Sequence, residues 1–174
     1  DTTERQLLLE QLRQHAEVDE LTGVMNRRMV LQTLEQEVAT AWQSQQPLSL
    51  VLFDVDRFKR INDSQGHQIG DLVLRQLASL LQTALNSGEQ LGRYGGDEFC
   101  IILVNCREEQ AKDLFVDRLI QRIKEKLVDV TISIGVAQTG PNEYVDASAL
   151  IRLADERMYI AKQAHKNAGQ TSST

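Results

Sequence analysis

The sequence predicts an α/β fold, an α+β sandwich in which helices flank a central, antiparallel-rich sheet. Stretches with helical periodicity alternate along the chain with short apolar runs. Two of these runs are separated only by a glycine turn, which predicts an antiparallel hairpin. The expected helices lie near residues 3–18, 27–44, 71–86, 107–126 and 147–164, and the expected strands near 48–54, 90–94, 98–104 and 129–137.

The first expected helix carries a short apolar stripe. Leu9, Leu12 and Ala16 recur at helical spacing, with Glu and Arg between them. Such a stripe is compatible with a coiled coil, although roughly three or four heptads are normally needed to identify one. The alternative is a helix that packs on its own domain. In the second helix, Trp42 is expected to pack against the core.

The first expected strand ends in two aspartates. Asp54 and Asp56 follow an apolar run and point the same way, because side chains alternate along a strand. Two like charges at the mouth of an apolar sheet repel each other and lose solvation, so a divalent cation would compensate them. Hard oxygen donors favour Mg²⁺ or Mn²⁺ over zinc. The alternative is a pair of solvated strand-end carboxylates.

The clearest helical pattern lies near residues 71–86. One face of this helix gathers apolar side chains and is expected to be buried against the sheet. These side chains are Leu74, Leu77, Ala78, Leu81 and Leu85.

The turn between the second and third expected strands is the most informative segment. Gly95 and Gly96 are followed by Asp97 and Glu98, and an apolar run then predicts a central strand buried on both faces. Glycine permits positive φ and a close approach of backbone to a ligand. An ordinary hairpin is the alternative, but two carboxylates at its tip match the first acidic pair. Together they predict a metal-dependent site.

Length and composition limit the classes of function that the chain can have. The 174 residues amount to one domain, and 41% hydrophobic with 25% charged residues is typical of a globular protein. A net charge of −6 argues against a broad nucleic-acid-binding surface. No apolar stretch approaches the roughly 20 residues that span a bilayer, and no signal peptide is visible. We therefore expect no nucleic acid and no membrane contact by this fragment.

The chain begins at Asp1, which we interpret as the start of a piece of a longer protein. A sensor or a membrane anchor in such a longer protein would lie outside this sequence. The spacing of Cys100 and Cys106 suits neither a zinc knuckle nor a redox pair, so we expect reduced thiols in a cytoplasmic domain.

Six motifs are spread over nearly the whole chain. They are residues 19–28 (DELTGVMNRR), 53–63 (FDVDRFKRIND), 66–71 (GHQIGD), 93–99 (RYGGDEF), 133–137 (SIGVA) and 154–162 (ADERMYIAK). With these motifs in this order, the chain resembles the GGDEF-domain diguanylate cyclases, the family that makes cyclic di-GMP from two GTP.

The resemblance implies a palm-like fold, shared with nucleotide cyclases and polymerases, and a homodimer with one GTP per subunit. It divides the chain into an N-terminal linker helix at 1–18, a GGDEF domain at 19–167 and a flexible tail at 168–174. In the family, a helix at the N-terminal position links an upstream sensor to the catalytic domain and helps to pair two copies.

The resemblance also implies catalytic and metal-binding roles. Asp54, the Val55 carbonyl and Asp97 would hold two Mg²⁺ (or Mn²⁺) ions against the triphosphate of one GTP. Asp97 would also accept the proton of the attacking ribose 3′-hydroxyl, with Glu98 as a supporting acid. Lys59 resembles the family's cation for the transition state.

Nucleotide recognition is implied at five further positions. Asn62 and Asp71, with His67 nearby, would bind guanine, whose N1–H and N2–H₂ donors a carboxylate can accept together. The local alternatives are a turn or cap at Asn62 and a helix-starting role for Asp71. Lys162 and Lys166 would neutralise the β and γ phosphates, although lone lysines are usually solvated surface charges.

Two departures from the family pattern stand out. The family's inhibitory product site has the form Arg-x-x-Asp, and residues 86–89 read Asn-Ser-Gly-Glu here, which removes its arginine. The family's usual glycine and arginine after the conserved lysine are His165 and Lys166.

The function predicted from the sequence is therefore a diguanylate cyclase that releases two pyrophosphates per cyclic di-GMP. The alternative is a catalytically degenerate GGDEF domain that binds GTP or a protein partner and regulates a neighbour. The family's pattern is intact at Asp54, Lys59, Asn62, Asp71, Asp97 and Glu98, and this favours the enzyme.

Overall fold

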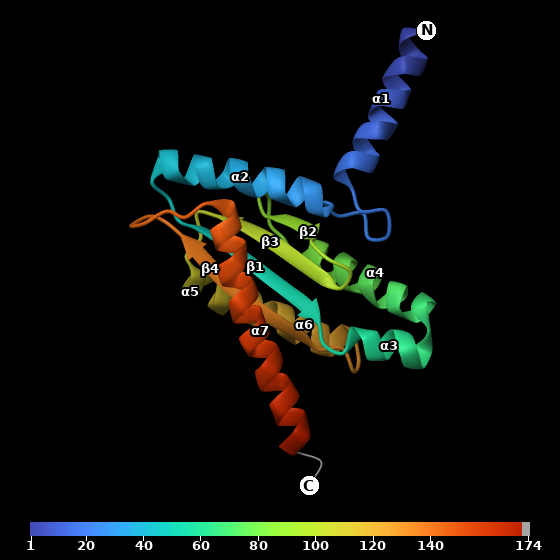
Figure 1. Cartoon of the computed structure of the whole chain (residues 1–174), viewed down its shortest axis with the longest axis vertical. Coiled ribbons are helices and arrows are strands. Elements are labelled where there is room, and N and C mark those ends of the chain that lie inside the picture. Colours follow the sequence, from blue (N-terminus) through green and yellow to red (C-terminus); the bar gives the residue numbers. More distant parts are fainter. Residues whose placement is uncertain (172–174) are drawn as a thin grey trace.

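The computed structural model describes residues 1–171, and it forms a sandwich around one four-stranded sheet (Figure 1). The strands are β1 (Leu48–Val55), β2 (Gln90–Arg93), β3 (Glu98–Val104) and β4 (Ile132–Thr139). The helices are α1 (Thr2–Glu17), α2 (Arg27–Ser44), α3 (Phe58–Gln65), α4 (His67–Ala84), α5 (Glu108–Gln110), the π-helical turn η1 (Ala111–Val116), α6 (Asp117–Lys126) and α7 (Ala147–Thr171).

The sheet is antiparallel throughout, as the sequence predicted. Its strand order is β2-β3-β1-β4, so β1 and β3 occupy the centre. β1 is buried along its whole length, and its residue Asp54 lies opposite Glu98 of β3 and Ser133 of β4. The ends of three strands therefore bring polar side chains to one place.

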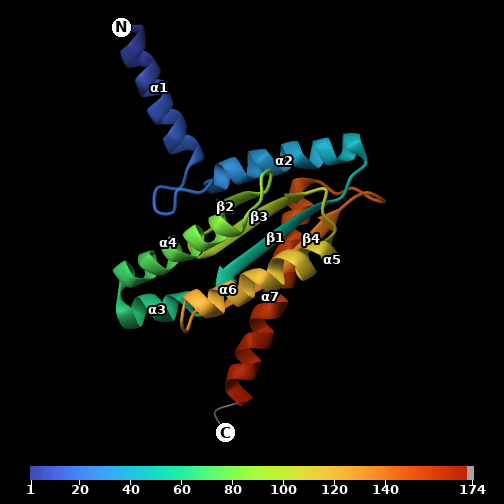
Figure 2. The same ribbon diagram turned by 180° about the vertical axis from the view of Figure 1, so that it is seen from behind.

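Helices cover both faces of the sheet, as Figures 1 and 2 show from opposite sides. Val51, Phe53 and Val55 of β1 pack in a core cluster with the apolar residues of α4 and α6. Leu50 and Leu52 belong to the other cluster, with α2 and α7. Because side chains alternate along a strand, Asp54 continues the face that α7 covers.

Helix α1 extends away from the sandwich (Figures 1 and 2). Leu7, Leu8, Leu9 and Leu12 are 57–65% exposed. The alternative in which this helix packs on its own domain is therefore wrong. The coiled-coil interpretation of its apolar stripe stays a prediction.

Three helical expectations need correction. The sequence analysis missed α3 and placed the start of α4 at residue 71 instead of His67. The α3 segment is polar and rich in turn-forming residues, but Phe58 and Ile61 pack on the core and supply its inner face. Gly66, at φ +91°, separates the two helices. Helix α7 continues to Thr171, so residues 168–171 of the expected tail are helical, while 172–174 lie outside the described residues.

Trp42 does not pack against the core, because its side chain is 61% exposed. The buried face of α2 is formed by Val30, Thr33, Leu34 and Ala41. One residue after Ala41, the helix has turned by about 100°, which directs Trp42 outward.

Both cysteines are free thiols. Burial raises the pKa of Cys100 to about 12, so this thiol is inert at neutral pH. Within residues 1–171, no helix has both the length and the apolar character needed to cross a membrane.

Candidate functional site

The candidate site lies where β1 ends beside the β2–β3 hairpin and the outer half of α7. Asp54, Glu98 and Lys162 line one cavity of about 620 Å³, together with Asp155 and Glu156. Three predicted site residues are thus brought together from three separate elements.

Asp54 is the most constrained residue of this site. It is only 3% exposed; its Oδ2 accepts a 2.8 Å hydrogen bond from Lys162 Nζ, while its buried Oδ1 has no hydrogen-bond partner among the described residues. Burial raises the pKa of Asp54; the bond and charge of Lys162 oppose this rise, and the charges of Asp97 and Asp56 add to it. A buried carboxylate oxygen without a donor is costly, and a cation would relieve this cost.

The hairpin tip holds Asp97 beside the end of β1. The turn closes through hydrogen bonds from the Tyr94 and Gly95 N–H groups to the Glu98 carbonyl, at 2.8 and 3.3 Å. The Val55 N–H donates to the Asp97 carbonyl at 3.3 Å, which ties the tip to β1. The backbone therefore places a second carboxylate next to the Asp54 strand end.

Glu98 shares this environment. Burial raises the pKa of its carboxyl, and the charges of Asp155, Asp97 and Asp54 raise it further. A carboxyl with a raised pKa can hold a proton closer to neutral pH than an exposed one, which suits a supporting acid.

Arg93 connects the hairpin tip to the segment that follows α1. Its Nε and Nη2 donate to the Gly96 carbonyl at 3.1 and 2.6 Å, and its Nη1 contacts both Asp19 carboxylate oxygens at 3.2 Å. Partial burial opposes ionisation of Asp19, but the hydrogen bonds from Thr22 and the charge of Arg93 lower its pKa overall. The sequence analysis missed this link, although Arg93 and Asp19 both lie in motifs that it identified.

Lys162 reaches the site because α7 lies very close to β4. A Cβ atom on Gly135 would come within 2.0 Å of the Ala154 carbonyl oxygen and 2.5 Å of the Met158 nitrogen. Only glycine allows this approach. The hydrogen bond that Lys162 donates to Asp54 is the main cause of the raised pKa of Lys162, so its ammonium group stays charged.

Asp56 points toward α7, as the alternation predicted, but its carboxylate has other partners. It accepts hydrogen bonds from Thr131 Oγ1 at 2.7 Å and Ser133 Oγ at 2.5 Å, and His165 Nδ1 lies 3.0 Å away. The two strand-end aspartates therefore differ, because Asp56 is saturated by protein donors and Asp54 is not. The sequence analysis assigned no contact to His165, whose only signal was the departure from the family's glycine.

Asn62 lies against Gly70, the residue before Asp71, where α3 packs on α4. A Cβ on Gly70 would lie 1.9 Å from Asn62 Oδ1, so the absence of a side chain at Gly70 leaves room for the Asn62 amide. Asp71 is the next residue, half-buried in the second turn of α4. Both capping alternatives are wrong, because Asn62 lies inside α3 and the N-cap of α4 is Gly66.

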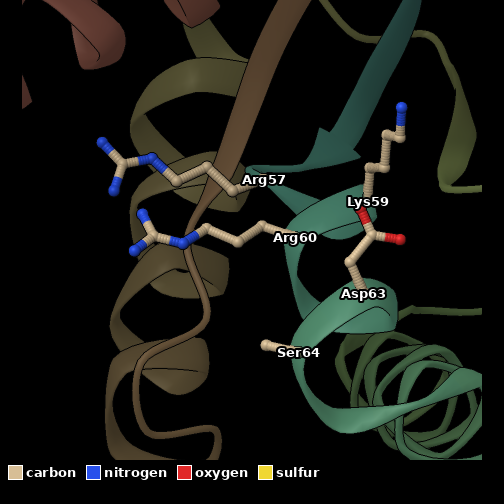
Figure 3. A pocket seen from close by; sticks show the side chains of 5 residues that line it. All are labelled: Arg57, Lys59, Arg60, Asp63 and Ser64. Carbon is tan, nitrogen blue, oxygen red and sulfur yellow. The ribbon is translucent and has the colours of Figure 1, made fainter.

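Lys59 does not line the cavity that holds Asp54, Glu98 and Lys162. It lines a surface hollow of about 590 Å³ with Arg57, Arg60, Asp63 and Ser64. Figure 3 shows the two arginines extending to one side of α3 and Lys59 pointing away from them.

His67 and Lys166 are exposed side chains, at the start of α4 and near the end of α7. Within residues 1–171, the side chains of Lys59, His67 and Lys166 form no hydrogen bond or ion pair. Their predicted roles depend on a bound nucleotide and stay predictions.

The residues present fit a divalent cation. No cluster of three or more His, Cys, Asp or Glu side chains in the described part of the chain could hold a metal by itself. The orphaned Asp54 Oδ1, the adjacent Val55 backbone and the nearby Asp97 nevertheless form a hard oxygen donor set. Such a set, completed by phosphate oxygens and water, is typical of Mg²⁺ sites.

The buried charge of Asp54 leads to a stability prediction for Asp54→Asn. Because the pKa of Asp54 is raised in the folded state, that state binds the proton more tightly than the unfolded chain does. The stability from this carboxyl is thus fully present at acidic pH and is lost as the pH rises through the raised pKa. At neutral pH, the near-isosteric Asn should raise Tm by about 2–4 °C, the change expected for roughly 1 kcal/mol in a domain of this size.

Thermal unfolding with and without Mg²⁺ tests this prediction. Mg²⁺ should stabilise the wild type and leave Asp54→Asn unchanged. Asp113→Asn, an exposed carboxylate in η1, is the matched control and should behave like the wild type. A lower Tm of Asp54→Asn with an intact Mg²⁺ response would contradict the assignment.

Residues 86–89 form a turn in place of the family's inhibitory motif. The Asn86 N–H donates to Glu89 Oε2 at 2.8 Å, and the Glu89 N–H donates to the Asn86 carbonyl at 3.2 Å. The only charged side chain of this segment is therefore partly used by its own turn, and no arginine is present.

Comparisons with known proteins agree with this geometry. Residues 16–168 match the family model described as "Diguanylate cyclase, GGDEF domain". DosC of Escherichia coli (strain K12), a diguanylate cyclase by name, is 36% identical over 169 residues, which cover 94% of this chain and 36% of DosC. Diguanylate cyclase DgcS of Shewanella oneidensis is 31% identical over 169 residues, which cover 95% of this chain and 56% of DgcS. The chain thus corresponds to one part of each longer relative.

Solved structures share the fold. The coiled coil and GGDEF domain of DgcB from Caulobacter crescentus, in complex with c-di-GMP, aligns with a TM-score of 0.84 and 27% identity, covering 94% of this chain and 91% of that one. Diguanylate cyclase SiaD from Pseudomonas aeruginosa, in complex with its activator SiaC, aligns with a TM-score of 0.80 and 31% identity, covering 94% of this chain and 64% of SiaD.

Proposed function

Because the chain belongs to the GGDEF family of diguanylate cyclases, we propose that it condenses two GTP into cyclic di-GMP and releases two pyrophosphates. The active form would be a homodimer with one GTP per subunit. The observation that carries the proposal is the buried, unpartnered Asp54 Oδ1 next to the Asp97 turn. A strand end of this kind suits a metal-dependent phosphoryl-type transfer.

Each polar residue of the site has a place in this reaction. Asp54, the Val55 carbonyl and Asp97 would hold two Mg²⁺ or Mn²⁺ ions, which supply positive charge to the phosphate oxygens when bound. Asp97 would accept the ribose 3′-hydroxyl proton, and Glu98, whose pKa is raised by burial and neighbouring carboxylates, would support it. Lys59 would stabilise charge that develops in the transition state.

Nucleotide binding would use both sides of the strand end. Asn62, whose amide lies against Gly70, and Asp71, the next residue of α4, would recognise the guanine edge, with His67 at the start of α4 nearby. Lys162 and Lys166 of α7 would neutralise the β and γ phosphates. Lys162 already faces the site, because it donates to Asp54 in the ligand-free chain.

Incubation of the purified chain with GTP and Mg²⁺, followed by mass identification of the products, tests the proposal. Cyclic di-GMP and pyrophosphate in a 1:2 ratio are the expected result of joining two nucleotides. GTP binding without product would instead support the alternative, a degenerate GGDEF domain with a regulatory role. A cyclic mononucleotide would exclude both.

Activity per chain is expected to rise with protein concentration, because each domain holds one GTP and two domains must face each other. The exposed leucines of α1 are suitable for pairing two copies and for receiving a signal from an upstream sensor domain in a parent chain. Leu9→Gln with Leu12→Gln should raise the concentration at half-maximal specific activity by about tenfold, roughly 1.4 kcal/mol of association energy.

Rates over a wide protein range, combined with sedimentation, provide the measurement. Leu114→Gln is the matched control, since Leu114 is an equally exposed leucine (63%) outside α1. Constant specific activity in a monomeric protein would refute the dimer requirement.

Product feedback through residues 86–89 is expected to be weak, because charge-assisted bidentate contacts are roughly twice as strong as neutral ones. Glu89 is also held by the Asn86 N–H and lacks an arginine neighbour. Calorimetric titration with cyclic di-GMP should show no tight site there, whereas Asn86→Arg combined with Glu89→Asp should gain about tenfold in affinity. Tight binding by the wild type that mutations at 86–89 abolish would show the prediction to be wrong.

A further inference from the structure

The outer half of α7 is attached to the sheet by polar contacts. Among the described side chains of this helix, Met158 is the last buried one, and the side chains of Tyr159 and Ile160 are 61% and 67% exposed. Beyond them, Lys162 contacts Asp54 and His165 contacts Asp56. The apolar core therefore does not orient the segment that carries Lys162 and Lys166.

The His165 contact belongs to a cluster that is closed by hydrogen bonds. Asp56 Oδ1 accepts from Ser133 Oγ at 2.5 Å, and Oδ2 accepts from Thr131 Oγ1 at 2.7 Å. His165 Nδ1 lies 3.0 Å from Asp56 Oδ2 and 3.1 Å from Ser133 Oγ. An ionised carboxylate only accepts, and the Ser133 proton is given to Asp56, so the proton between these groups and the ring belongs to Nδ1.

The sheet side of this cluster is buried. Ser133 is fully buried in β4, and the side chain of Asp56 is only 10% exposed. The Asp56 N–H also donates to the Thr131 carbonyl at 2.8 Å, which joins the end of β1 to the start of β4. The imidazole, by contrast, is 52% exposed on the helix surface. The contact thus joins an exposed side chain of α7 to buried groups at the ends of β1 and β4.

We infer that His165 is a positioning residue, which anchors the end of α7 to Asp56 and Ser133 so that Lys162 and Lys166 face the phosphate groups of the nucleotide. Lys162 lies three residues before His165 and four before Lys166, and residues at these spacings lie on the same side of a helix. A contact at position 165 therefore holds the part of α7 that carries both lysines. This inference rests on the proposed function for the phosphates, while the anchor itself concerns the ligand-free chain.

The anchor matters most when nucleotide binds. In the proposed function, Lys162 exchanges Asp54 for phosphate oxygens, which releases its own attachment of α7 to β1. The His165 contact involves no residue that would bind the metal or the nucleotide, so it persists through this exchange. Without it, the two lysines would have to be ordered at the expense of nucleotide affinity.

Three variants separate the anchor from helix propensity. His165→Ala removes the ring and introduces the best helix former, whereas His165→Asn is a poorer helix former that keeps an amide N–H near the place of Nδ1. Loss of the anchor therefore predicts less protection from exchange in His165→Ala than in His165→Asn, whereas helix propensity alone predicts the reverse. Gln163→Ala is the matched control, because Gln163 lies in the same turn and its side chain has no hydrogen-bond partner within residues 1–171.

Hydrogen exchange of the ligand-free chain is the first measurement. His165→Ala should speed exchange of the backbone amides in residues 162–168 by about tenfold, the effect of losing one hydrogen bond to a charged group. His165→Asn should restore most of the protection, and Gln163→Ala should match the wild type. Protection in His165→Ala equal to the wild type, or greater than in His165→Asn, would overturn the anchor.

Nucleotide affinity is the second measurement, made with the GTP analogue that carries a methylene bridge between the α and β phosphates. His165→Ala should weaken its binding about tenfold and raise KM for GTP similarly, while kcat changes less than about twofold. An unchanged Kd, or a fall in kcat at constant KM, would contradict the positioning role. If the wild type made no cyclic di-GMP, the proposed function would fail, while exchange and analogue binding would still decide the anchor.

Discussion

Asp97→Asn is expected to abolish formation of cyclic di-GMP while the domain stays folded. The substitution removes a metal-binding charge and the proposed proton acceptor with almost no change in volume. The hairpin should persist, because the Asp97 group that bonds to Val55 is its backbone carbonyl. We expect a loss on the order of 10³-fold or more, about 4 kcal/mol in the activation barrier.

Initial rates at saturating GTP and Mg²⁺, with thermal unfolding as the test of folding, provide the measurement. Asp113→Asn makes the same chemical change at an exposed position of η1 and should keep the wild-type rate. Asp97→Asn also removes one of the charges that raise the pKa of Asp54, so its Tm should not fall. Near-normal cyclisation by Asp97→Asn would refute the proposed mechanism.

GTP should be preferred over ATP by roughly 10⁴-fold in kcat/KM, because a site built to pair with specific donors leaves polar groups unsatisfied with the wrong base. Guanine offers two donors to a carboxylate, whereas adenine presents an acceptor at N1 that an ionised Asp71 would repel. In the structure, Gly70 lets the Asn62 amide approach α4 immediately before Asp71, so the two side chains proposed to bind the base come from adjacent places.

Asp71→Asn tests the origin of this preference. Its amide can accept from guanine or donate to adenine, so the ratio of kcat/KM values should shrink to about 10² or less. The loss should come mainly from slower use of GTP. Asp113→Asn again serves as the control and should keep full discrimination. Comparable rates with both nucleotides in the wild type would exclude the role of Asp71.

The sequence was sufficient to predict the sheet and the acidic centre, because both depend on short-range patterns. The apolar run of β1 leads directly into Asp54, and the glycine turn carries Asp97 on the neighbouring hairpin. Their approach followed from antiparallel pairing. In the structure, Asp54 of β1 lies directly opposite Glu98 of β3.

What the sequence did not reveal depends on contacts between distant segments. The link from Asp19 through Arg93 to Gly96 joins residues 74 positions apart, and no local pattern predicts such a bond. The different states of Asp54 and Asp56 could not be separated either, because two aspartates at equal strand positions look alike until Thr131, Ser133 and His165 are placed around one of them. Helix α3 was missed because its polar composition is typical of a turn.

The ion pair between Asp54 and Lys162 has a consequence for the order in which ligands can enter. In the ligand-free chain the buried carboxylate and the ammonium group satisfy each other. A divalent cation arriving alone would take the carboxylate and leave Lys162 without a counter-charge, and a polyphosphate arriving alone would take Lys162 and leave Asp54 buried and unpaired. When the two arrive together, one ion pair is replaced by two. Metal and nucleotide should therefore bind with positive cooperativity, each tightening the other's affinity by the same factor.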